Sequence, residues 1–275
     1  MSSETRRIAS DGSTPRPLPP TPRGLRGRLG RPVWQEFRGF GEYREVREHP
    51  VWQGEGIPDG RGRPVILLGG WMASPRSIGA LAHVLGNAGW NPQIPAIGRN
   101  AGAAYEAIDT TVDHLRELTA STGEPVTVIG HSRGGQYARI IAVRHPELVA
   151  SVVTVSARVR VRYPPFLVVN APANAFDFLV RRGLLGPVEE PREDAVDVDQ
   201  QLPFPVTIPY VSIWSRTDGL VDWRFCLDPA AHDIEVDATH LGICNSIEGA
   251  TAVGEALRLI DAGDPRVRPG LPLDG

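Results

Sequence analysis

The chain has 275 residues, of which 41 % are hydrophobic and 22 % are charged, and its formal net charge is −3. This length suits one globular domain with a large core, and the nearly balanced charge indicates neither a nucleic-acid-binding protein nor an acidic disordered one. All 29 basic residues are arginine, which excludes Schiff-base chemistry, a lysine-bound pyridoxal cofactor and a P-loop lysine.

Both ends of the chain differ in composition from its middle. Residues 1–31 hold seven arginines, two acidic residues and a proline-rich stretch, which predicts a disordered basic arm. Arg6 and Arg7 are not followed by the apolar region of a twin-arginine export signal, and no apolar run is long enough to span a membrane, so we expect a cytoplasmic protein. Residues 263–275 are rich in proline and glycine and are predicted to form a surface tail. The domain is therefore expected to span residues 32–262.

Between the two ends, segments with strand and helix patterns alternate. The predicted strands are short apolar or β-branched runs at residues 64–68, 91–97, 126–129, 149–155, 209–214 and 234–238. The predicted helices have apolar residues at helical spacing and lie at residues 77–88, 103–119, 132–145 and 247–260. This alternation predicts an α/β fold, with a mostly parallel, doubly wound sheet that is covered by helices on both faces.

One motif stands at the centre of this pattern. The pentapeptide Gly130-His131-Ser132-Arg133-Gly134 directly follows the predicted strand 126–129 and opens the helix predicted after it. In a Gly-x-Ser-x-Gly turn between a strand and a helix, the serine is held in a strained conformation and its hydroxyl stands clear of the sheet. We therefore predict that Ser132 is a nucleophile.

A serine nucleophile needs a histidine base that is oriented by a carboxylate. Among the seven histidines, His240 lies just past the carboxyl end of the last predicted strand, the edge where reactive groups collect in parallel sheets. Asp218 lies in the loop after strand 209–214, at the same edge, and is the predicted acid. Asp222, four residues further on, is the rival candidate.

Acyl transfer also requires N–H donors for the negative charge that develops on the carbonyl oxygen. The backbone amide of Arg133, directly after the nucleophile, is predicted to be one donor. The other is expected from the loop Gly69-Gly70-Trp71-Met72 after strand 64–68, with Trp71 as the first choice and Met72 as the second. The alternative is a plain turn in which the Trp71 side chain only packs.

These motifs resemble those of the α/β-hydrolase superfamily, and specifically its small serine esterases and lipases, over about residues 64–260. The resemblance is carried by Leu67-Leu68-Gly69-Gly70-Trp71, Gly130-His131-Ser132-Arg133-Gly134-Gly135, Thr217-Asp218-Gly219-Leu220-Val221 and Thr239-His240. The chain order serine, aspartate, histidine is also that of the superfamily.

Two loops of this sequence can be compared with loops of superfamily members. Members that resemble this chain often have His-Gly at the oxyanion loop, and Gly69 stands where that histidine would be. The backbone donor is retained, but the support that the histidine would give is missing. The segment Arg99-Asn100-Ala101-Gly102 is similar to a loop of bacterial esterase-like members, and the sequence assigns no chemical role to it.

In that superfamily, the segment before the acid-bearing strand commonly forms a cap over the site. Here residues 156–205 are apolar in their first half and acidic in their second, and a connection of about 50 residues is longer than a simple crossover needs. We predict a cap or lid insertion whose apolar underside favours hydrophobic acyl groups. The alternative is that these side chains only pack onto the sheet.

The resemblance implies a serine carboxylic-ester hydrolase that acts on small to medium hydrophobic acyl esters through an acyl-enzyme on Ser132. A small-molecule ester is the expected partner, and no nucleic acid, metal or organic cofactor is implied. An acyltransferase with the same residues and a non-catalytic binding protein remain as alternatives, and thioesters, lactones and amides are not ranked. Cys226 and Cys244 flank a predicted strand and form either one disulfide or, as we expect, two free thiols.

Overall fold

A sheet of six strands lies at the centre of the protein, in a computed structural model that describes residues 33–73, 75–97, 100, 104–160, 198, 202 and 204–267. The strands are β1 (Pro64–Leu68), β2 (Asn91–Gln93), β3 (Val126–His131), β4 (Val149–Val155), β5 (Tyr210–Ser215) and β6 (His232–Val236). They lie in the order β2-β1-β3-β4-β5-β6, and every neighbouring pair is parallel. The predicted α/β fold with a parallel sheet is confirmed.

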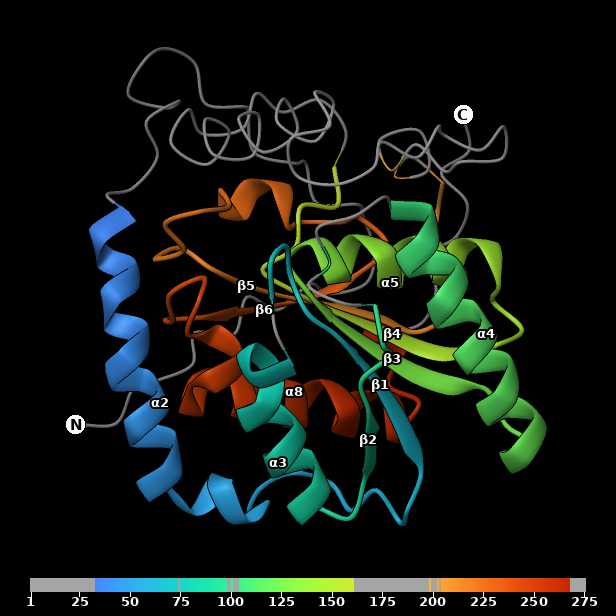
Figure 1. Ribbon diagram of the computed structural model, residues 1–275, viewed down its shortest axis with the longest axis horizontal. Helices are drawn as coiled ribbons and strands as arrows, with labels where there is room; N and C mark the ends of the chain where they lie inside the picture. Colours follow the sequence, from blue (N-terminus) through green and yellow to red (C-terminus); the bar gives the residue numbers. More distant parts are fainter. Residues whose placement is uncertain are drawn as a thin grey trace.

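Helices cover both faces of this sheet (Figure 1). The helices α3 (Gly79–Asn87) and α8 (Ile247–Asp261) pack on one face, and α4 (Ala104–Thr122) and α5 (Arg133–Arg144) pack on the other. Side chains of β1 alternate between the two cores, because Val65 and Leu67 contact the first layer and Ile66 and Leu68 the second. The strand is therefore apolar throughout, as expected for a parallel strand buried on both faces.

The strand order creates a crevice at one edge of the sheet. From β1 the chain crosses one face through α3 to β2, and it then returns across the other face through α4 to β3, on the opposite side of β1. The loops after β1 and β3 therefore leave the sheet toward opposite faces, and such a switch in direction opens a crevice at the carboxyl ends of the strands. Gly69 follows β1 and Ser132 follows β3, so both border this crevice.

The predicted boundaries agree with the structure where strands are apolar and differ where they are polar or contain proline. β1 and β4 have the predicted limits. β2 ends at Gln93 instead of residue 97, since Pro95 has no N–H to continue the ladder. β6 begins and ends two residues earlier than the prediction of 234–238. The helix predicted at 77–88 begins with a 3-10 turn, η3 (Pro75–Ile78), and continues as α3.

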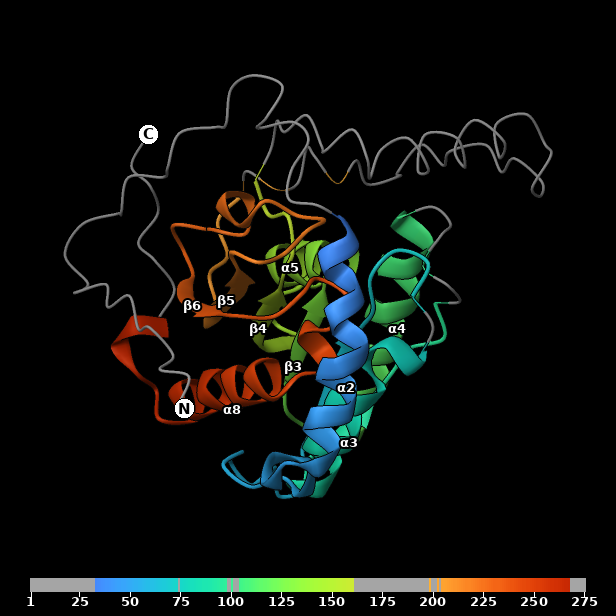
Figure 2. The same ribbon diagram turned by 90° about the vertical axis from the view of Figure 1, so that its left-hand side faces the viewer.

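Three elements before the sheet were not predicted: η1 (Val33–Arg38), α2 (Gly39–Glu48) and η2 (Pro50–Gln53). In Figure 1 α2 lies at the left side of the molecule, and in Figure 2, where this side faces the viewer, it lies in front of the rest of the domain. It contacts α8 and the short helix η5 (Ile243–Asn245), which comes directly after the loop that carries His240. The N-terminal part of the domain is thus brought to the edge of the candidate site.

Several predictions fall partly or wholly outside the described residues. The arm at residues 1–31 lies outside them, as does most of the cap at residues 156–205, so both remain predictions. At the other end, η6 (Pro265–Val267) is described and Val267 is buried in the core, whereas residues 268–275 lie outside. Cys226 and Cys244 are both free and buried, so the structure has the two thiols and not the disulfide.

Candidate active site

Ser132 occupies a strained turn between β3 and α5. Its backbone has φ 53° and ψ −121°, a conformation that residues other than glycine rarely adopt. Its N–H donates to the carbonyl oxygen of Val155 at 2.9 Å, and its own carbonyl accepts from the N–H groups of Gly135 and Gln136 at 3.0 and 3.3 Å. Hydrogen bonds on both sides of the residue therefore hold the strained conformation in place.

The glycines that flank Ser132 allow backbone segments to approach one another closely. A Cβ atom on Gly134 would collide with the carbonyl oxygens of Leu68 and Gly69, and one on Gly130 would collide with the carbonyl of Gly134. The first turn of α5 consequently begins directly against the loop that follows β1. This contact puts the nucleophile beside the predicted oxyanion loop.

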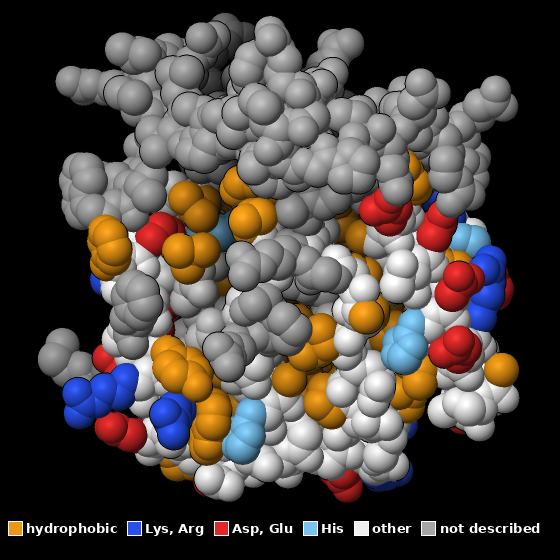
Figure 3. Space-filling model, in the orientation of Figure 1, with side chains coloured by type: hydrophobic (Ala, Val, Ile, Leu, Met, Phe, Trp, Pro, Cys, Tyr) orange, Lys and Arg blue, Asp and Glu red, His pale blue; other side chains and the backbone are white. Residues whose placement is uncertain are grey.

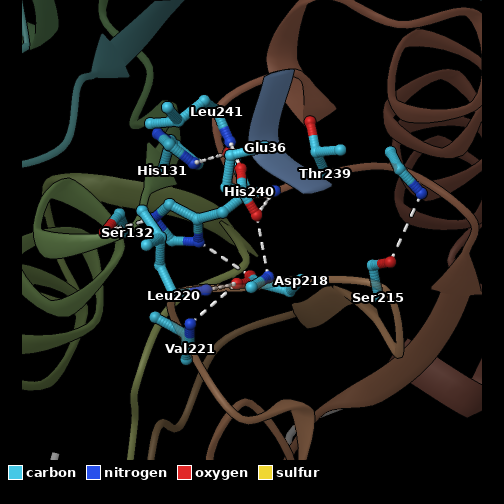
Figure 4. Close-up of polar contacts among 12 residues, drawn as sticks. Glu36, His131, Ser132, Ser215, Asp218, Leu220, Val221, Thr239, His240 and Leu241 are labelled. Atoms are coloured by element: carbon cyan, nitrogen blue, oxygen red, sulfur yellow. Dashed lines mark hydrogen bonds and ion pairs between the residues drawn. The ribbon is translucent and has the colours of Figure 1, made fainter. Parts of the chain in front are cut away.

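Ser132, His240 and Asp218 form a continuous chain of hydrogen bonds (Figure 4). The Nε2 atom of His240 lies 3.0 Å from Oγ of Ser132, and its Nδ1 atom lies 2.7 Å from Oδ2 of Asp218. Because the carboxylate can only accept, it fixes the proton on Nδ1 and leaves the Nε2 lone pair directed at the serine hydroxyl. The three residues come from the loops after β3, β6 and β5, so the structure brings together the residues predicted from the strand ends.

Both carboxylate oxygens of Asp218 accept hydrogen bonds, which fixes the orientation of the side chain. Its second carboxylate oxygen, Oδ1, accepts from the N–H groups of Leu220 and Val221 at 2.8 and 2.7 Å. The rival carboxylate, Asp222, instead accepts from the N–H of Arg224 at 3.0 Å and pairs with the Arg224 guanidinium at 3.1 Å. It caps the short helix η4 (Trp223–Phe225), so Asp218 and not Asp222 meets His240.

The environment of His240 favours its protonated form. Burial acts to lower the pKa of this imidazole, but the charge of Asp218, the hydrogen bond to it and the charge of Glu36 act in the opposite direction. The net effect raises the pKa of His240 above the ordinary value of 6.5. His240 therefore binds a proton more readily than a free imidazole does, which suits a group that accepts a proton from the serine hydroxyl.

His131, the neighbour of Ser132, has the opposite environment. Its Nε2–H donates to the carbonyl oxygen of His240 at 2.9 Å, and the two imidazole rings are 4.8 Å apart. Its Nδ1 atom is buried and has no hydrogen-bond partner among the residues that the structure describes. Burial and the nearby positive charge of protonated His240 lower the pKa of His131 from 6.5 to about 3, so it remains neutral at physiological pH.

Neutral His131 is expected to make the protein sensitive to acid. The unfolded chain takes up a proton at this residue near pH 6.5, whereas the folded protein resists protonation down to about pH 3. The stability that depends on neutral His131 is complete above pH 6.5 and is lost progressively as the pH falls toward 3. Between pH 6.5 and 5 the loss is expected to be about 2 kcal/mol in the free energy of unfolding.

The variant His131→Gln separates this effect from other acid-labile groups, since the glutamine amide can still donate a hydrogen bond. Urea unfolding at pH 7 and pH 5 should show a smaller loss of stability on acidification in the variant than in the wild-type protein. The raised pKa of His240 acts in the opposite direction, but it is present in both proteins. An equal loss in both would contradict a buried neutral His131.

The loop after β1 lies against the nucleophile. A Cβ atom on Gly70 would stand 3.0 Å from Cβ of Ser132 and 3.5 Å from its Oγ, so the backbone at Gly70 and Trp71 passes beside the hydroxyl. The N–H of Ala73 donates to the carbonyl of Gly70 at 3.2 Å and closes a turn, in which Met72 has φ 56°. Arg133 is the first residue of α5. Which amides of this region act as oxyanion donors remains a prediction.

Asn100 supplies support that the sequence did not account for. Its side-chain Nδ2 donates to the carbonyl oxygen of Gly69 at 2.8 Å. The backbone carbonyl oxygen of Asn100 accepts from the Arg133 guanidinium at 3.3 Å. The residue is buried and has φ 52°, a conformation that asparagine tolerates better than most residues. Asn100 thus contacts both the loop after β1 and the first residue of α5, and its hydrogen bond to Gly69 stabilises that loop.

Two carboxylates from the N-terminal part of the domain contact the site, and the sequence did not predict these contacts. Glu36 accepts hydrogen bonds from the backbone N–H groups of Gly219, His240 and Leu241, and Glu42 accepts from Thr239. No local pattern around either glutamate indicates these contacts, because their partners are distant in the chain. In the part of the chain that the structure describes, no cluster of three histidine, cysteine or acidic side chains is arranged to hold a metal ion.

Comparisons with known proteins agree with this architecture. A family model for the α/β-hydrolase fold matches residues 85–198. The structures similar to this chain include one reported with the metagenome-derived lipolytic enzymes LipS and LipT, which is 19 % identical, has a TM-score of 0.54 and covers 75 % of this chain and 96 % of that one. No curated protein sequence matches the chain significantly.

Two further solved structures are similar to this chain. A structure from a study of carboxylesterases of Nitrososphaera gargenis is 14 % identical, with a TM-score of 0.53, and covers 75 % of this chain and 93 % of its own. A monoacylglycerol lipase of Paleococcus ferrophilus is 18 % identical, with a TM-score of 0.50, and covers 74 % and 96 %. At such identities the likeness establishes the fold, which is that of the α/β-hydrolases. Among the described residues, no helix has the length and apolar character needed to cross a membrane.

Proposed function

We propose that this protein, which has the α/β-hydrolase fold, is a serine hydrolase that cleaves carboxylic esters with small to medium hydrophobic acyl chains. The observation that carries the proposal is the hydrogen-bonded series from Ser132 through His240 to Asp218, with distances of 3.0 and 2.7 Å. Within this series the serine hydroxyl has a base in direct contact, and the base has a buried carboxylate behind it. Such an arrangement activates a hydroxyl that is otherwise scarcely ionised at neutral pH.

The reaction proceeds in two steps. Oγ of Ser132 attacks the ester carbonyl while Nε2 of His240 takes its proton, and Asp218 stabilises the imidazolium that results. His240 then gives this proton to the leaving alkoxide, which leaves the acyl group on Ser132. Water, deprotonated by the same histidine, attacks the acyl-enzyme and releases the acid.

The oxyanion that forms in each step is assigned to the backbone amides of Trp71 and Arg133. Gly70 packs against Ser132, which supports a donor from this loop, and Arg133 begins a helix whose N-terminal N–H groups favour negative charge. One such donor contributes about 3–4 kcal/mol in comparable sites.

Exposed apolar side chains next to the site favour a hydrophobic substrate. Large hydrophobic side chains reach the surface in several groups on the face shown in Figure 3. Three residues that belong to the loops beside Ser132 and His240 are at least a third exposed: Trp71 at 37 %, Met72 at 39 % and Leu241 at 58 %. An acyl chain that binds beside the nucleophile can cover this apolar surface, and the removal of that surface from water favours binding.

The proposal is tested by the hydrolysis of p-nitrophenyl esters from acetate to palmitate, together with labelling by a fluorophosphonate. Turnover that depends on chain length, with the label located on Ser132 by mass spectrometry, is the expected result. Transfer of the acyl group to an added alcohol in preference to water would instead identify an acyltransferase. An unlabelled Ser132 in the folded protein would exclude a catalytic nucleophile.

Asn100 offers a test of the oxyanion loop. The variant Asn100→Gly removes the carboxamide that donates to Gly69, while glycine adopts the left-handed backbone without strain. Loss of a hydrogen bond worth about 1 to 1.5 kcal/mol is expected to lower kcat roughly tenfold with little change in KM. The matched control is Asn91→Gly on the exposed edge strand β2, and equal kcat values for both variants would contradict a role for Asn100.

A further inference from the structure

Glu36 is a buried carboxylate whose hydrogen bonds within the described part of the chain all come from backbone amides near the candidate site. It is 5 % exposed and belongs to η1, far from the motifs of the sequence. Its Oε1 accepts from the N–H of Gly219 at 2.8 Å and from the N–H of His240 at 3.2 Å, and its Oε2 accepts from the N–H of Leu241 at 2.8 Å (Figure 4). One carboxylate therefore joins the residue after Asp218 to His240 itself.

The surrounding chain is shaped to receive this carboxylate. A Cβ atom on Gly219 would lie 2.8 Å from Oε1 of Glu36, so a larger residue at this position would displace the carboxylate. Glu42 makes a related contact on the other side of the loop, where its carboxylate accepts from the N–H and the hydroxyl of Thr239 at 3.2 and 2.9 Å. Such close contacts on either side of His240 indicate a built site and not an incidental surface contact.

Among the described residues, no cation pairs with the Glu36 carboxylate. None of the ion pairs among the described residues includes it. A buried carboxylate without a cation is costly in free energy unless its oxygens are hydrogen-bonded, and here three N–H groups donate to them. The negative charge of Glu36 also acts on the imidazole of His240 and favours its protonated form.

We propose that Glu36 is a positioning residue of the active site, which holds the Asp218 and His240 loops together and places a second negative charge beside the imidazolium of His240. The inference rests on the proposed function, because the imidazolium forms when His240 takes the proton of Ser132. Glu36 forms no bond to substrate and exchanges no proton. It acts through the backbone of His240 and through its charge.

Among the described residues, few titratable groups contact His240, which makes the effect of Glu36 measurable. They are Asp218 from the loop after β5, His131 from the end of β3 and Glu36 from η1. Glu42 and Arg38 belong to the same N-terminal segment and lie beyond Thr239 and Asp237. Since His131 stays neutral above about pH 3, the acid limb of the rate profile reports the titration of His240.

The variant Glu36→Gln removes the charge and one acceptor while it keeps the size of the side chain. We expect kcat for a p-nitrophenyl ester to fall about tenfold, with KM within about twofold, because Glu36 does not touch the substrate. The acid limb of kcat/KM is expected to move to lower pH by roughly half a unit, since a negative charge that favours the imidazolium is lost. Glu36→Asp retains the charge on a shorter side chain and should lower kcat with a smaller displacement of the limb.

Controls separate positioning from a general loss of structure. Glu48→Gln changes the same charge on the exposed side of α2 and is expected to leave both kcat and the acid limb unchanged. Circular dichroism and the melting temperature show whether each variant is folded. If both Glu36 variants fail to fold, Gly219→Ala takes their place, because its methyl group displaces the carboxylate while the charge is kept. A drop in kcat at constant KM would then support the proposal, and wild-type kcat would overturn it.

Failure of this inference is distinguishable from failure of the proposed function. If the wild-type protein hydrolyses esters and folded Glu36→Gln has the same acid limb, Glu36 has only a structural role and the proposal is overturned. If the wild-type protein hydrolyses no ester, the pKa of His240 is followed by NMR in both proteins. A lower pKa in the variant would support the effect of Glu36 while the proposed function fails, and an equal pKa would overturn the inference.

Discussion

Replacement of Ser132 by alanine is expected to lower kcat for ester hydrolysis by about 10⁴-fold or more, since no other group of the site can form the acyl-enzyme. The residual activity would come from the oxyanion donors and from substrate binding. The substitution removes the hydrogen bond between Oγ and Nε2 of His240 and leaves the strained backbone of the turn as it is. The melting temperature should therefore remain close to that of the wild-type protein.

The measurement is the steady-state rate with the ester of optimal chain length, on protein whose folded fraction is known. Ser121→Ala at the exposed end of α4 is the matched control, because its hydroxyl also makes one hydrogen bond, to the carbonyl of Leu118. This control is expected to retain full activity. If folded Ser132→Ala retained more than about one-hundredth of the wild-type kcat, hydrolysis would have to proceed without the serine, and the proposed mechanism would be wrong.

The second large effect is expected at Asp218. An asparagine there has nearly the same shape, but its amide group favours the tautomer of His240 in which Nε2 carries the proton and cannot act as a base. A loss of about 10⁴-fold in kcat is expected, which is the size of the effect of the same substitution in a known serine–histidine–aspartate triad. Fluorophosphonate labelling of Ser132 should slow to a similar extent, because it requires the same activated hydroxyl.

Asp222→Asn tests the rival candidate for the acid that orients His240. Its carboxylate caps η4 and pairs with Arg224, so its replacement should change stability and leave kcat within about threefold. Both variants carry the same chemical change four residues apart. If Asp222→Asn lost the activity and Asp218→Asn kept it, the acid would have to be reassigned.

The parts of the fold that were predicted well are those in which side-chain burial leaves a local pattern. β1 is an apolar run and β4 is rich in β-branched residues, glycine or serine follows each, and the structure has both strands at the predicted residues. β6 reads His232-Asp233-Ile234-Glu235-Val236, and its polar first residues delayed its predicted start. α2 was missed because Gly39 and Gly41 weaken its helical pattern and because Glu42, a carboxylate, is among its buried residues.

The residues of the candidate site likewise fall into those that were predicted and those that were not. Ser132, Asp218 and His240 were found because the carboxyl ends of parallel strands meet at one edge, so that chain order alone brings them close together. The sequence marked the loop around Asn100 but assigned no role to it. Its role follows only from the hydrogen bond between Asn100 and Gly69, which the structure shows. Glu36 has no local signature, since a single glutamate in a short helix is ordinarily a solvated side chain.

The contacts of Glu36 also bear on when the protein becomes active during its synthesis. Its hydrogen bonds to Gly219, His240 and Leu241 join residues that are 183, 204 and 205 positions apart. Contacts across such separations require the closure of long loops and form late in folding. Glu36 is therefore synthesised about 200 residues before the partners that it binds. A growing chain that ends before His240 is expected to be inactive, even when it already contains Ser132 in its turn.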